Sequence, residues 1–220
     1  GKLELHETKS GEKTLYIPSM DETYHSRNGA ISESKHVFIK QGINRTQGNI
    51  HILEIGFGTG LNALLASQEA KVQNRKIAYH TLEPFPVPND LLIKLNYGQL
   101  LKDDELYKKI HYSKWESNEV ITYNFTIHKT KQKLEDINLN ESQYDVIFFD
   151  AFAPKKQPEL WAKDVFTKLF KSLKNDGILT TYSAAGQLKR DLRSIGFQLE
   201  HPPGANGKRE MTVAIKTPTL

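Results

Sequence analysis

Short apolar runs alternate with longer amphipathic stretches from Asn49 to the end of the chain. The runs read NIHILEIG, KIAYHTLE, VITYNFTIH, YDVIFFDAF, GILTTYS, FQLEH and MTVAIK. Strand-length runs that alternate with helix-like stretches predict a parallel sheet with helices on both faces. The last two runs leave no room for a helix between them, so they predict a final antiparallel pair. We therefore expect an α/β fold with a Rossmann-like seven-stranded sheet whose last strand is antiparallel.

Residues 1–48 have a different pattern, and we expect an N-terminal extension packed on the core. The runs LELHET and KTLYIP flank the turn signal KSGE, which predicts a β-hairpin. From Ala30 to Gly42 the apolar spacing is helical and ends on a glycine. Residues 49–220 contain no repeat, low-complexity tract or Gly/Ser/Pro-rich linker, so we expect one globular unit there.

Composition narrows the class of protein. The chain has 220 residues, 38% hydrophobic and 25% charged, which is enough for one core. It has no cysteine, which excludes disulfides, thiol catalysis and thiolate metal sites. Its net charge of +4 mildly favours a polyanionic partner. The absence of an 18-residue apolar run and of a secretory signal in the first twenty residues predicts a cytoplasmic protein that is not in a membrane.

The decapeptide LEIGFGTGLN, residues 53–62, ends the first core strand. Gly56, Gly58 and Gly60 allow a tight turn and let a ligand approach the backbone closely. Glu54 supplies a carboxylate that can pair with a cationic group, and Asn62 closes the motif. S-adenosylmethionine carries an ammonium and a sulfonium, so the motif indicates a site for that cofactor. The alternative is a plain strand-to-helix turn.

Glu83 ends the second strand, about twenty residues past the glycines, where a carboxylate can accept both ribose hydroxyls. A surface acid at a strand end is the alternative interpretation. The third strand end, Ile127 to Thr130, offers no acid for the adenine amine, so adenine recognition is left unassigned. His80, His111, His128 and His201 lack metal-ligand spacing, and we expect no metal.

Asp150 is the main catalytic candidate, because it ends the strand YDVIFFD and runs directly into Ala-Phe-Ala-Pro. Methyl transfer to nitrogen needs a neutral amine whose lone pair points at the methyl group, so an acceptor that orients the N–H groups contributes most. Phe152 stands beside it as an aromatic wall. In the alternative interpretation Asp150 caps the following helix or fixes the loop, and Phe152 belongs to the core.

Four segments resemble one known family. They are Tyr24-His25-Ser26 with Gly29 and Glu33-Ser34 through Val37-Phe38, the glycine loop LEIGFGTGLN, the block DAFAPKKQPELW, and the late segment GKREM. On these motifs the chain resembles the MnmC-like tRNA 5-methylaminomethyl-2-thiouridine methyltransferase family, in its stand-alone form. The resemblance implies a class I S-adenosylmethionine-dependent fold. It also implies N-methylation of 5-aminomethyl(-2-thio)uridine at the tRNA wobble position, on the anticodon stem-loop.

Residue by residue, the resemblance implies that Gly56, Gly58, Gly60 and Glu83 hold the cofactor and that Asp150 and Phe152 face the modified base. The substrate-binding positions that it implies are Tyr24, Ser26, Pro154, Lys155, Lys208, Arg209 and Glu210. The sequence contains no second nucleotide motif, so we expect no FAD-dependent domain. A separate FAD-dependent oxidoreductase acting in trans, or the preceding pathway enzymes, would then supply the amine.

Two features remain open. The basic residues expected to meet tRNA phosphates are Lys155, Lys156, Lys189, Arg190, Arg193, Lys208 and Arg209. The long segment Pro84–Glu119 forms either a lid or packing over the sheet. Two other functions stay possible: methylation of a small-molecule amine, and binding of S-adenosylmethionine and RNA without turnover.

Overall fold

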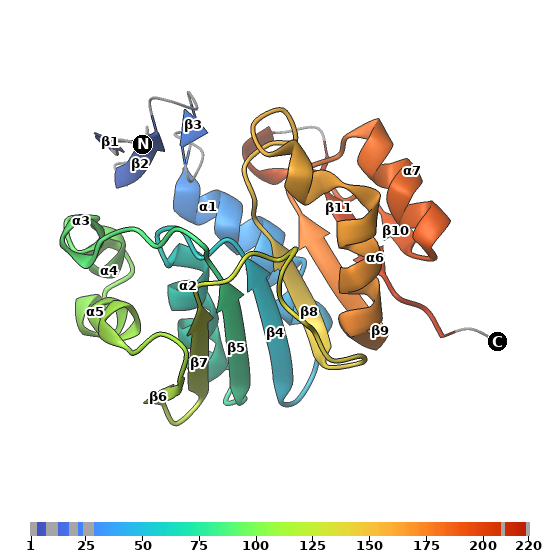
Figure 1. Ribbon diagram of the computed structural model, residues 1–220. Coiled ribbons are helices and arrows are strands. Elements are labelled where there is room, and N and C mark those ends of the chain that lie inside the picture. Colours follow the sequence, from blue (N-terminus) through green and yellow to red (C-terminus); the bar gives the residue numbers. More distant parts are fainter. Residues whose placement is uncertain (1–3, 8–12, 18–21, 24–28, 208–209, 219–220) are drawn as a thin grey trace.

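The centre of the computed structural model is an eight-stranded sheet (Figure 1). Its strand order is β10-β11-β9-β8-β4-β5-β7-β6. The structure describes residues 4–7, 13–17, 22–23, 29–207 and 210–218. The strands are β4 (Ile50–Ile55), β5 (Ile77–Leu82), β6 (Asn118–Thr122), β7 (Phe125–Thr130), β8 (Tyr144–Phe149), β9 (Leu173–Thr181), β10 (Gln198–Glu200) and β11 (Thr212–Ile215). Strands β4, β5, β7, β8 and β9 are parallel. The final strand, β11, is antiparallel to both β9 and β10, as predicted.

The interpretation of VITYNFTIH as one strand is wrong, and the sheet therefore has eight strands instead of seven. The run folds back on itself as the antiparallel pair β6 and β7. Tyr123 at the turn is 78% exposed, while the Asn124 side chain donates a hydrogen bond to the Arg75 carbonyl at 3.0 Å. The polar pair Tyr-Asn is thus a turn signal inside a β-rich run.

The expected alternation of strand and helix also fails between β7 and β8. Residues 131–143 form neither a helix nor a strand. Their sequence is mostly polar, and Leu134 is the one apolar side chain of this segment in the buried core. Without a helical apolar face the segment has nothing to bury as a helix. It runs instead past the carboxyl ends of the strands and contributes to the site described below.

Helices cover both faces of the sheet. The helices of the core are α2 (Leu61–Val72), α3 (Asn89–Leu92), α4 (Tyr97–Leu100), α5 (Asp104–Tyr112), α6 (Lys163–Ser172) and α7 (Gly186–Ile195), with short turns η3 (Ile43–Arg45), η4 (Pro158–Trp161) and η5 (Ala205–Gly207). Side chains of α2 and α5 pack with Ile52 and Phe148 on one face. Those of α6 and α7 pack with Leu53 and Phe149 on the other face. The alternation along each strand produces this division.

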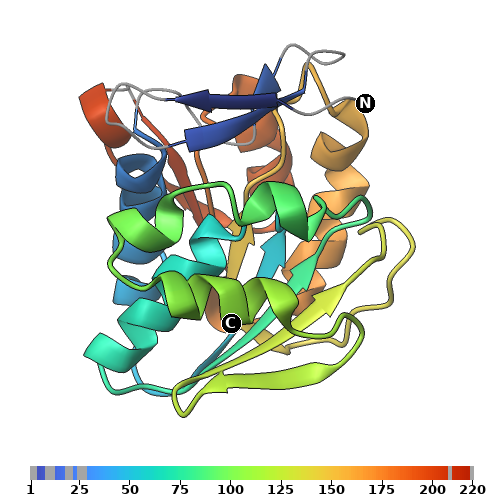
Figure 2. The same ribbon diagram turned by 90° about the vertical axis from the view of Figure 1, so that its left-hand side faces the viewer.

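The N-terminal extension holds the expected hairpin and helix. Strands β1 (Glu4–Glu7) and β2 (Lys13–Ile17) pair antiparallel, and β3 (Glu22–Thr23) extends them to three strands. The helix starts as α1 (Ala30–Ser34) and continues as the wider π-helical turns of η2 (Lys35–Lys40), whose Val37 and Phe38 enter the main core. Both views place β1–β3 at the end of the molecule toward which the parallel strands run (Figure 2).

The segment Pro84–Glu119 contributes both packing and cavity wall. Its helix α5 packs with Leu106 and Ile110 into the core beside α2. Its first residues, including Phe85, line the cavity at the carboxyl ends of the strands. Over the described part of the chain, no helix has both the length and the apolar character needed to cross a membrane.

Candidate active site

A cavity of about 690 Å³ opens at the carboxyl ends of β4, β5 and β8. Open α/β sheets bind ligands at this edge, where neighbouring loops diverge. Among the residues expected from the sequence, the structure brings together Gly56, Gly58, Glu83, Asp150 and Phe152 as parts of its wall. Residues from three separate strand ends therefore meet in one site.

The glycine loop forms a cradle that side chains would fill. Gly56 has a φ of 91°, and a Cβ on it would lie 3.1 Å from the carbonyl oxygen of Asp150. Gly60, also left-handed with a φ of 78°, precedes the first turn of α2. Such backbone geometry favours glycine and leaves the peptide groups accessible to a ligand. The loop thus provides the close-approach surface that the motif predicts.

Glu83 lies at the end of β5 and faces the same cavity. Its Oε1 accepts a hydrogen bond from the Gly58 amide at 3.0 Å, and its Oε2 accepts one from the Phe85 amide at 3.3 Å. Burial raises the pKa of Glu83, and these two backbone hydrogen bonds oppose the rise. The carboxylate therefore links the glycine loop to the end of β5 and still borders the cavity.

Asp150 and Glu54 are neighbouring acids: Glu54 is buried, and Asp150 is half-buried and reaches the cavity. Burial raises the pKa of Asp150 to about 7; the negative charge of Glu33 acts in the same direction, and the hydrogen bond from Asn62 opposes it. The Asn62 side chain donates that bond to Oδ2 at 2.9 Å. Burial also raises the pKa of Glu54 to about 8, and Thr81 donates to its Oε1 at 2.8 Å.

The capping alternative for Asp150 is wrong. The next helical turn, η4, has Gln157 at its N-cap, and α6 has Ala162 there. The Asp150 amide instead donates to the Ile55 carbonyl at 3.2 Å, which holds the strand end of β8 against β4. Phe152 is half-buried and lines the cavity, so it is not part of the closed core.

The two raised pKa values predict how stability depends on pH. A carboxyl whose pKa is higher in the folded state binds a proton more tightly there than in the unfolded state. Its contribution to folding stability is therefore fully present below the pKa of the unfolded state, and it is lost as pH rises through the folded-state values of about 7 and 8. We expect the melting temperature of the ligand-free protein to fall by at least about 5 °C between pH 5 and pH 8. The Glu54→Gln variant should show a shallower fall in differential scanning calorimetry. An equal slope in both proteins would contradict this assignment.

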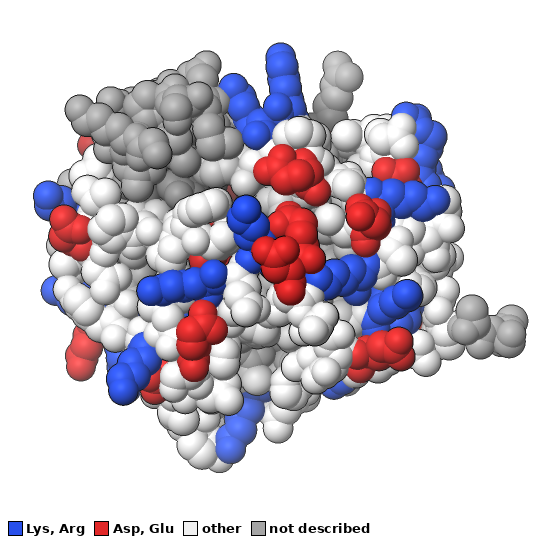
Figure 3. Space-filling view, in the orientation of Figure 1, with Lys and Arg blue, Asp and Glu red and all other residues white. Residues whose placement is uncertain are grey.

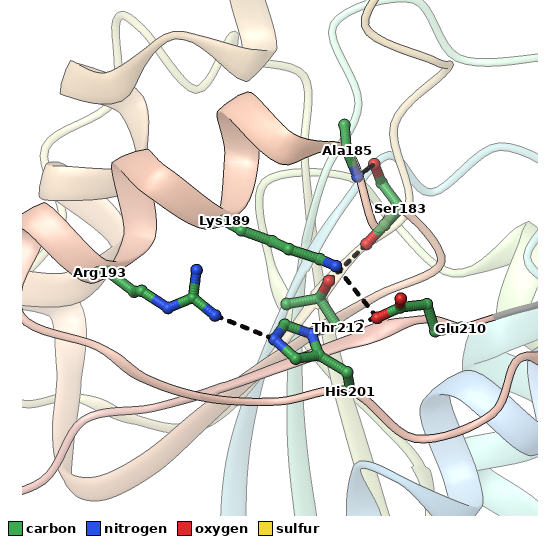
Figure 4. Close-up of polar contacts among 7 residues, drawn as sticks. All are labelled: Ser183, Ala185, Lys189, Arg193, His201, Glu210 and Thr212. Atoms are coloured by element: carbon green, nitrogen blue, oxygen red, sulfur yellow. Dashed lines mark hydrogen bonds and ion pairs between the residues drawn. The ribbon is translucent and has the colours of Figure 1, made fainter.

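The residues expected at the entrance are only partly described. Tyr24, Ser26, Lys208 and Arg209 lie outside the described residues. Glu210 is described, and its Oε2 accepts a hydrogen bond from Lys189 of α7 at 3.1 Å (Figure 4).

Glu210 belongs to a chain of polar contacts that ties the last strand to α7. His201 Nδ1 lies 3.6 Å from the same oxygen, and Arg193 contacts the other ring nitrogen at 3.3 Å (Figure 4). The charge of Lys189 is therefore already paired. Met211, next in sequence, is buried.

Pro154 and Lys155 lie in the turn after β8. Pro154 is half-buried and Lys155 is exposed, and neither is among the cavity residues. The neighbouring Lys156 lines the cavity instead. In this turn, the basic residue that lines the cavity is thus one position further along the chain than the resemblance implied.

Helix α5 supports the glycine loop from outside, which the sequence pattern does not reveal. The Tyr107 hydroxyl donates to the Thr59 carbonyl at 2.9 Å. The His111 ring lies over Gly60, where a Cβ would stand 2.6 Å from its Cε1 atom. These contacts span about fifty residues of sequence, and no local motif marks them.

The end of β7 explains why no acid follows the third strand. Lys129 is buried there, and its Nζ donates to the carbonyls of Ile110 and His111 at 2.9 and 3.0 Å. A cation at these carbonyls stabilises the C-terminal end of α5. Residues 132–135 follow and line the cavity. The end of β7 therefore stabilises α5, and the loop that follows it forms this part of the cavity wall.

The donor set fits a cofactor with a ribose and a cationic amino-acid end. The glycine cradle excludes side chains from the floor, and the carboxylates of Glu83 and Asp150 border the cavity. Carboxylates accept hydrogen bonds from hydroxyl and ammonium groups. No group of three or more metal-ligating side chains gathers anywhere in the described ranges.

Comparisons with known proteins agree on one chemistry. Residues 95–217 match the model of a family described as S-adenosyl-L-methionine-dependent methyltransferase. The chain is 30% identical over 229 residues to the tRNA 5-methylaminomethyl-2-thiouridine biosynthesis bifunctional protein MnmC of Cupriavidus metallidurans, covering 95% of this chain and 33% of that protein. The MnmC protein of Leptospira interrogans is 31% identical over 212 residues, covering 88% and 32%. The chain thus spans about a third of the length of these relatives.

The fold also has a solved counterpart. The crystal structure of MNMC2 from Aquifex aeolicus superposes with a TM-score of 0.72 at 24% identity. The superposition covers 100% of this chain and 72% of that one. This likeness establishes the Rossmann-like fold.

Proposed function

The chain belongs to the family of S-adenosyl-L-methionine-dependent methyltransferases, and from that premise we propose that it methylates the exocyclic amine of 5-aminomethyl(-2-thio)uridine at the wobble position of tRNA. One observation carries the proposal. Asp150, a half-buried carboxyl with a pKa of about 7, borders the cavity next to the glycine cradle, where an amine acceptor would need it. The names of the MnmC relatives support the choice of the tRNA amine.

The cofactor is held by the residues of the cradle. S-adenosylmethionine, when bound, supplies a methyl group activated by its sulfonium. Gly56, Gly58 and Gly60 provide the floor, and Glu83 accepts from ribose hydroxyls. Asn62 acts from beneath through its hydrogen bond to Asp150, and the buried Glu54 lies close enough for the charge of Asp150 to raise its pKa.

Asp150 and Phe152 act on the acceptor. An aliphatic ammonium has no lone pair to donate, so it must lose a proton before it can attack. The ionised Asp150 carboxylate attracts the ammonium, takes or orients its N–H, and leaves the nitrogen lone pair free. Phe152 gives the uracil ring an apolar wall at the same cavity. A general base works best when its pKa is close to the operating pH, and the pKa of about 7 meets this condition near neutral pH.

The remaining partners follow from this substrate. The chain should contact the anticodon stem-loop through cations near the cavity, with Lys156 in its wall and Arg190 and Arg193 on α7. We propose that the aminomethyl group is made beforehand, by a separate FAD-dependent oxidoreductase in trans or by the preceding pathway enzymes. An enzyme that modifies tRNA works in the cytoplasm, which is the compartment we propose.

A small-molecule amine is the second candidate, and the surface charge gives a reason to keep it. Among the described residues, the face shown in Figure 3 carries acids and bases interspersed, without a continuous basic patch. At the cavity itself Lys133 and Lys156 alternate with Glu135 and Glu159. A phosphate-binding surface normally gathers one sign of charge. The described part of this face therefore does not by itself require a nucleic acid.

The test is methyl transfer from labelled S-adenosylmethionine to bulk tRNA from cells that lack this gene, followed by nucleoside mass analysis. We expect one methyl group on 5-aminomethyl-type uridine and a rate that falls steeply with salt. tRNA from cells that cannot make the aminomethyl group is the matched control and should gain no label. Tight cofactor binding without label in tRNA would favour the small amine, or a protein that binds without turnover.

A further inference from the structure

The backbone of Ala151 and Phe152, just after Asp150, is held by side chains from two places in the fold, the turn η4 with its N-cap and the end of β9. The Tyr182 hydroxyl donates to the Ala151 carbonyl at 2.8 Å. Trp161 Nε1 donates to the Phe152 carbonyl at 2.7 Å. Gln157 Oε1 accepts from the Phe152 amide at 3.0 Å. Both backbone polar groups of Phe152 are therefore fixed by side chains, in a loop that forms no helix or strand.

The aromatic members are anchored in the core beneath α6. Trp161 is 8% exposed and packs edge-on against Phe149 at 4.9 Å between ring centroids. Tyr182, at the end of β9, lies edge-on to Trp161 at 6.1 Å. Their polar ends point at the loop backbone, and Trp161 is enclosed, so neither is placed as a stacking platform for a base. The core fixes the positions of these two side chains, and they in turn hold the loop in place.

Gln157 closes the loop on itself. Its amide donates to the Ala153 carbonyl at 3.0 Å, and the Lys156 amide donates to the same oxygen at 2.8 Å. The side chain of Gln157 then reaches back to Phe152 while also lining the cavity. A half-buried wall residue whose acceptor oxygen bonds the backbone cannot move without releasing Phe152.

We propose that Gln157, Trp161 and Tyr182 are positioning residues that hold the Phe152 peptide, and thereby the acceptor wall next to Asp150, in the geometry for transfer. The inference rests on the proposed function, which assigns Asp150 and Phe152 to the acceptor. In-line transfer depends on alignment, and a shift of about 1 Å in a positioning group can lower a rate by about a hundredfold. None of the three side chains needs to touch the reacting atoms to have this effect.

Three substitutions each remove one hydrogen bond. Tyr182→Phe and Gln157→Leu do so with little change in packing, and Trp161→Phe also removes one ring of the enclosed indole. We expect kcat for tRNA to fall by at least about tenfold in each, with the Kd for S-adenosylmethionine within about twofold of wild type. Hydrogen exchange at the Phe152 amide should become faster in Gln157→Leu. Gln157→Glu keeps an acceptor oxygen, so it should restore slow exchange. A double variant should lower kcat by less than the product of the two single decreases, because both side chains act on one peptide.

Tyr144→Phe is the matched control. Tyr144 begins β8, at the opposite end of that strand from Asp150, and the substitution removes a hydroxyl that bonds His80 at 2.7 Å. It should leave kcat unchanged. The proposal is overturned if the three variants keep wild-type kcat, or if kcat and cofactor affinity fall together. If wild-type protein fails to methylate tRNA, the proposed function is wrong. Unchanged hydrogen exchange at the Phe152 amide in Gln157→Leu would overturn the positioning role independently of that result.

Discussion

Replacing Asp150 by asparagine should lower kcat for amine methylation by at least about a hundredfold, with affinity for S-adenosylmethionine changed by no more than about threefold. Asparagine has nearly the same shape, and its amide oxygen can still accept the 2.9 Å bond from Asn62. What it loses is the charge that attracts an ammonium and the capacity to take a proton. Single-turnover rates and calorimetric titration of the cofactor measure the two quantities separately.

The pH profile gives the same prediction a second, independent readout. With a pKa of about 7, Asp150 is mostly protonated below pH 6 and mostly ionised above pH 8. Because the ionised form is the active one, wild-type kcat should rise through pH 7, and the residual rate of Asp150→Asn should lack that limb. The profile can also contain the titration of Glu54, whose pKa is raised in part by the charge of Asp150. Glu159→Gln, in the same cavity wall, is the control and should keep the wild-type profile. Equal rates in Asp150→Asn and wild type would leave Asp150 without a catalytic role.

The parts of this molecule that are local in sequence were the predictable ones. The glycine loop and the acids at 83 and 150 each follow a strand, and parallel strands bring their carboxyl ends to one edge. Their meeting in one cavity therefore follows from strand pattern alone. The split of VITYNFTIH was not predictable from alternation, because Tyr123 and Asn124 fit a strand until Asn124 is seen bonding the Arg75 carbonyl.

The supporting residues escape sequence reasoning for a different reason. Tyr182 bonds Ala151 across 31 positions, and Tyr107 bonds Thr59 across 48. A hydroxyl at the end of a strand or on a helix carries no local sign of the carbonyl that it will meet. Gln157 is close to Phe152 in sequence, but only the loop conformation shows that its side chain turns back. Such contacts depend on tertiary packing, which periodicity does not encode.

Replacing Gly60 by alanine should destabilise the protein by about 2–4 kcal/mol and weaken S-adenosylmethionine binding at least about tenfold, because strain and overlap add at one residue. The left-handed φ of 78° disfavours any side chain. A Cβ there would also lie 2.6 and 2.7 Å from two atoms of His111 and 3.1 Å from Phe57. His111 cannot simply move away, since it is buried and packs against Tyr107 at 4.4 Å between centroids.

Two further variants separate strain from overlap. Gly48 has a φ of 69°, and a Cβ on it would have no neighbour within 4 Å, so Gly48→Ala measures the strain alone. It should cost about 1 kcal/mol and leave cofactor affinity unchanged. Adding His111→Ala to Gly60→Ala should recover about 1–3 kcal/mol relative to the sum of the single effects. Denaturant unfolding and cofactor titration provide the data. If Gly60→Ala behaves like Gly48→Ala in both, then α5 does not hold the glycine loop, and the loop shape must come from the β4–α2 turn itself.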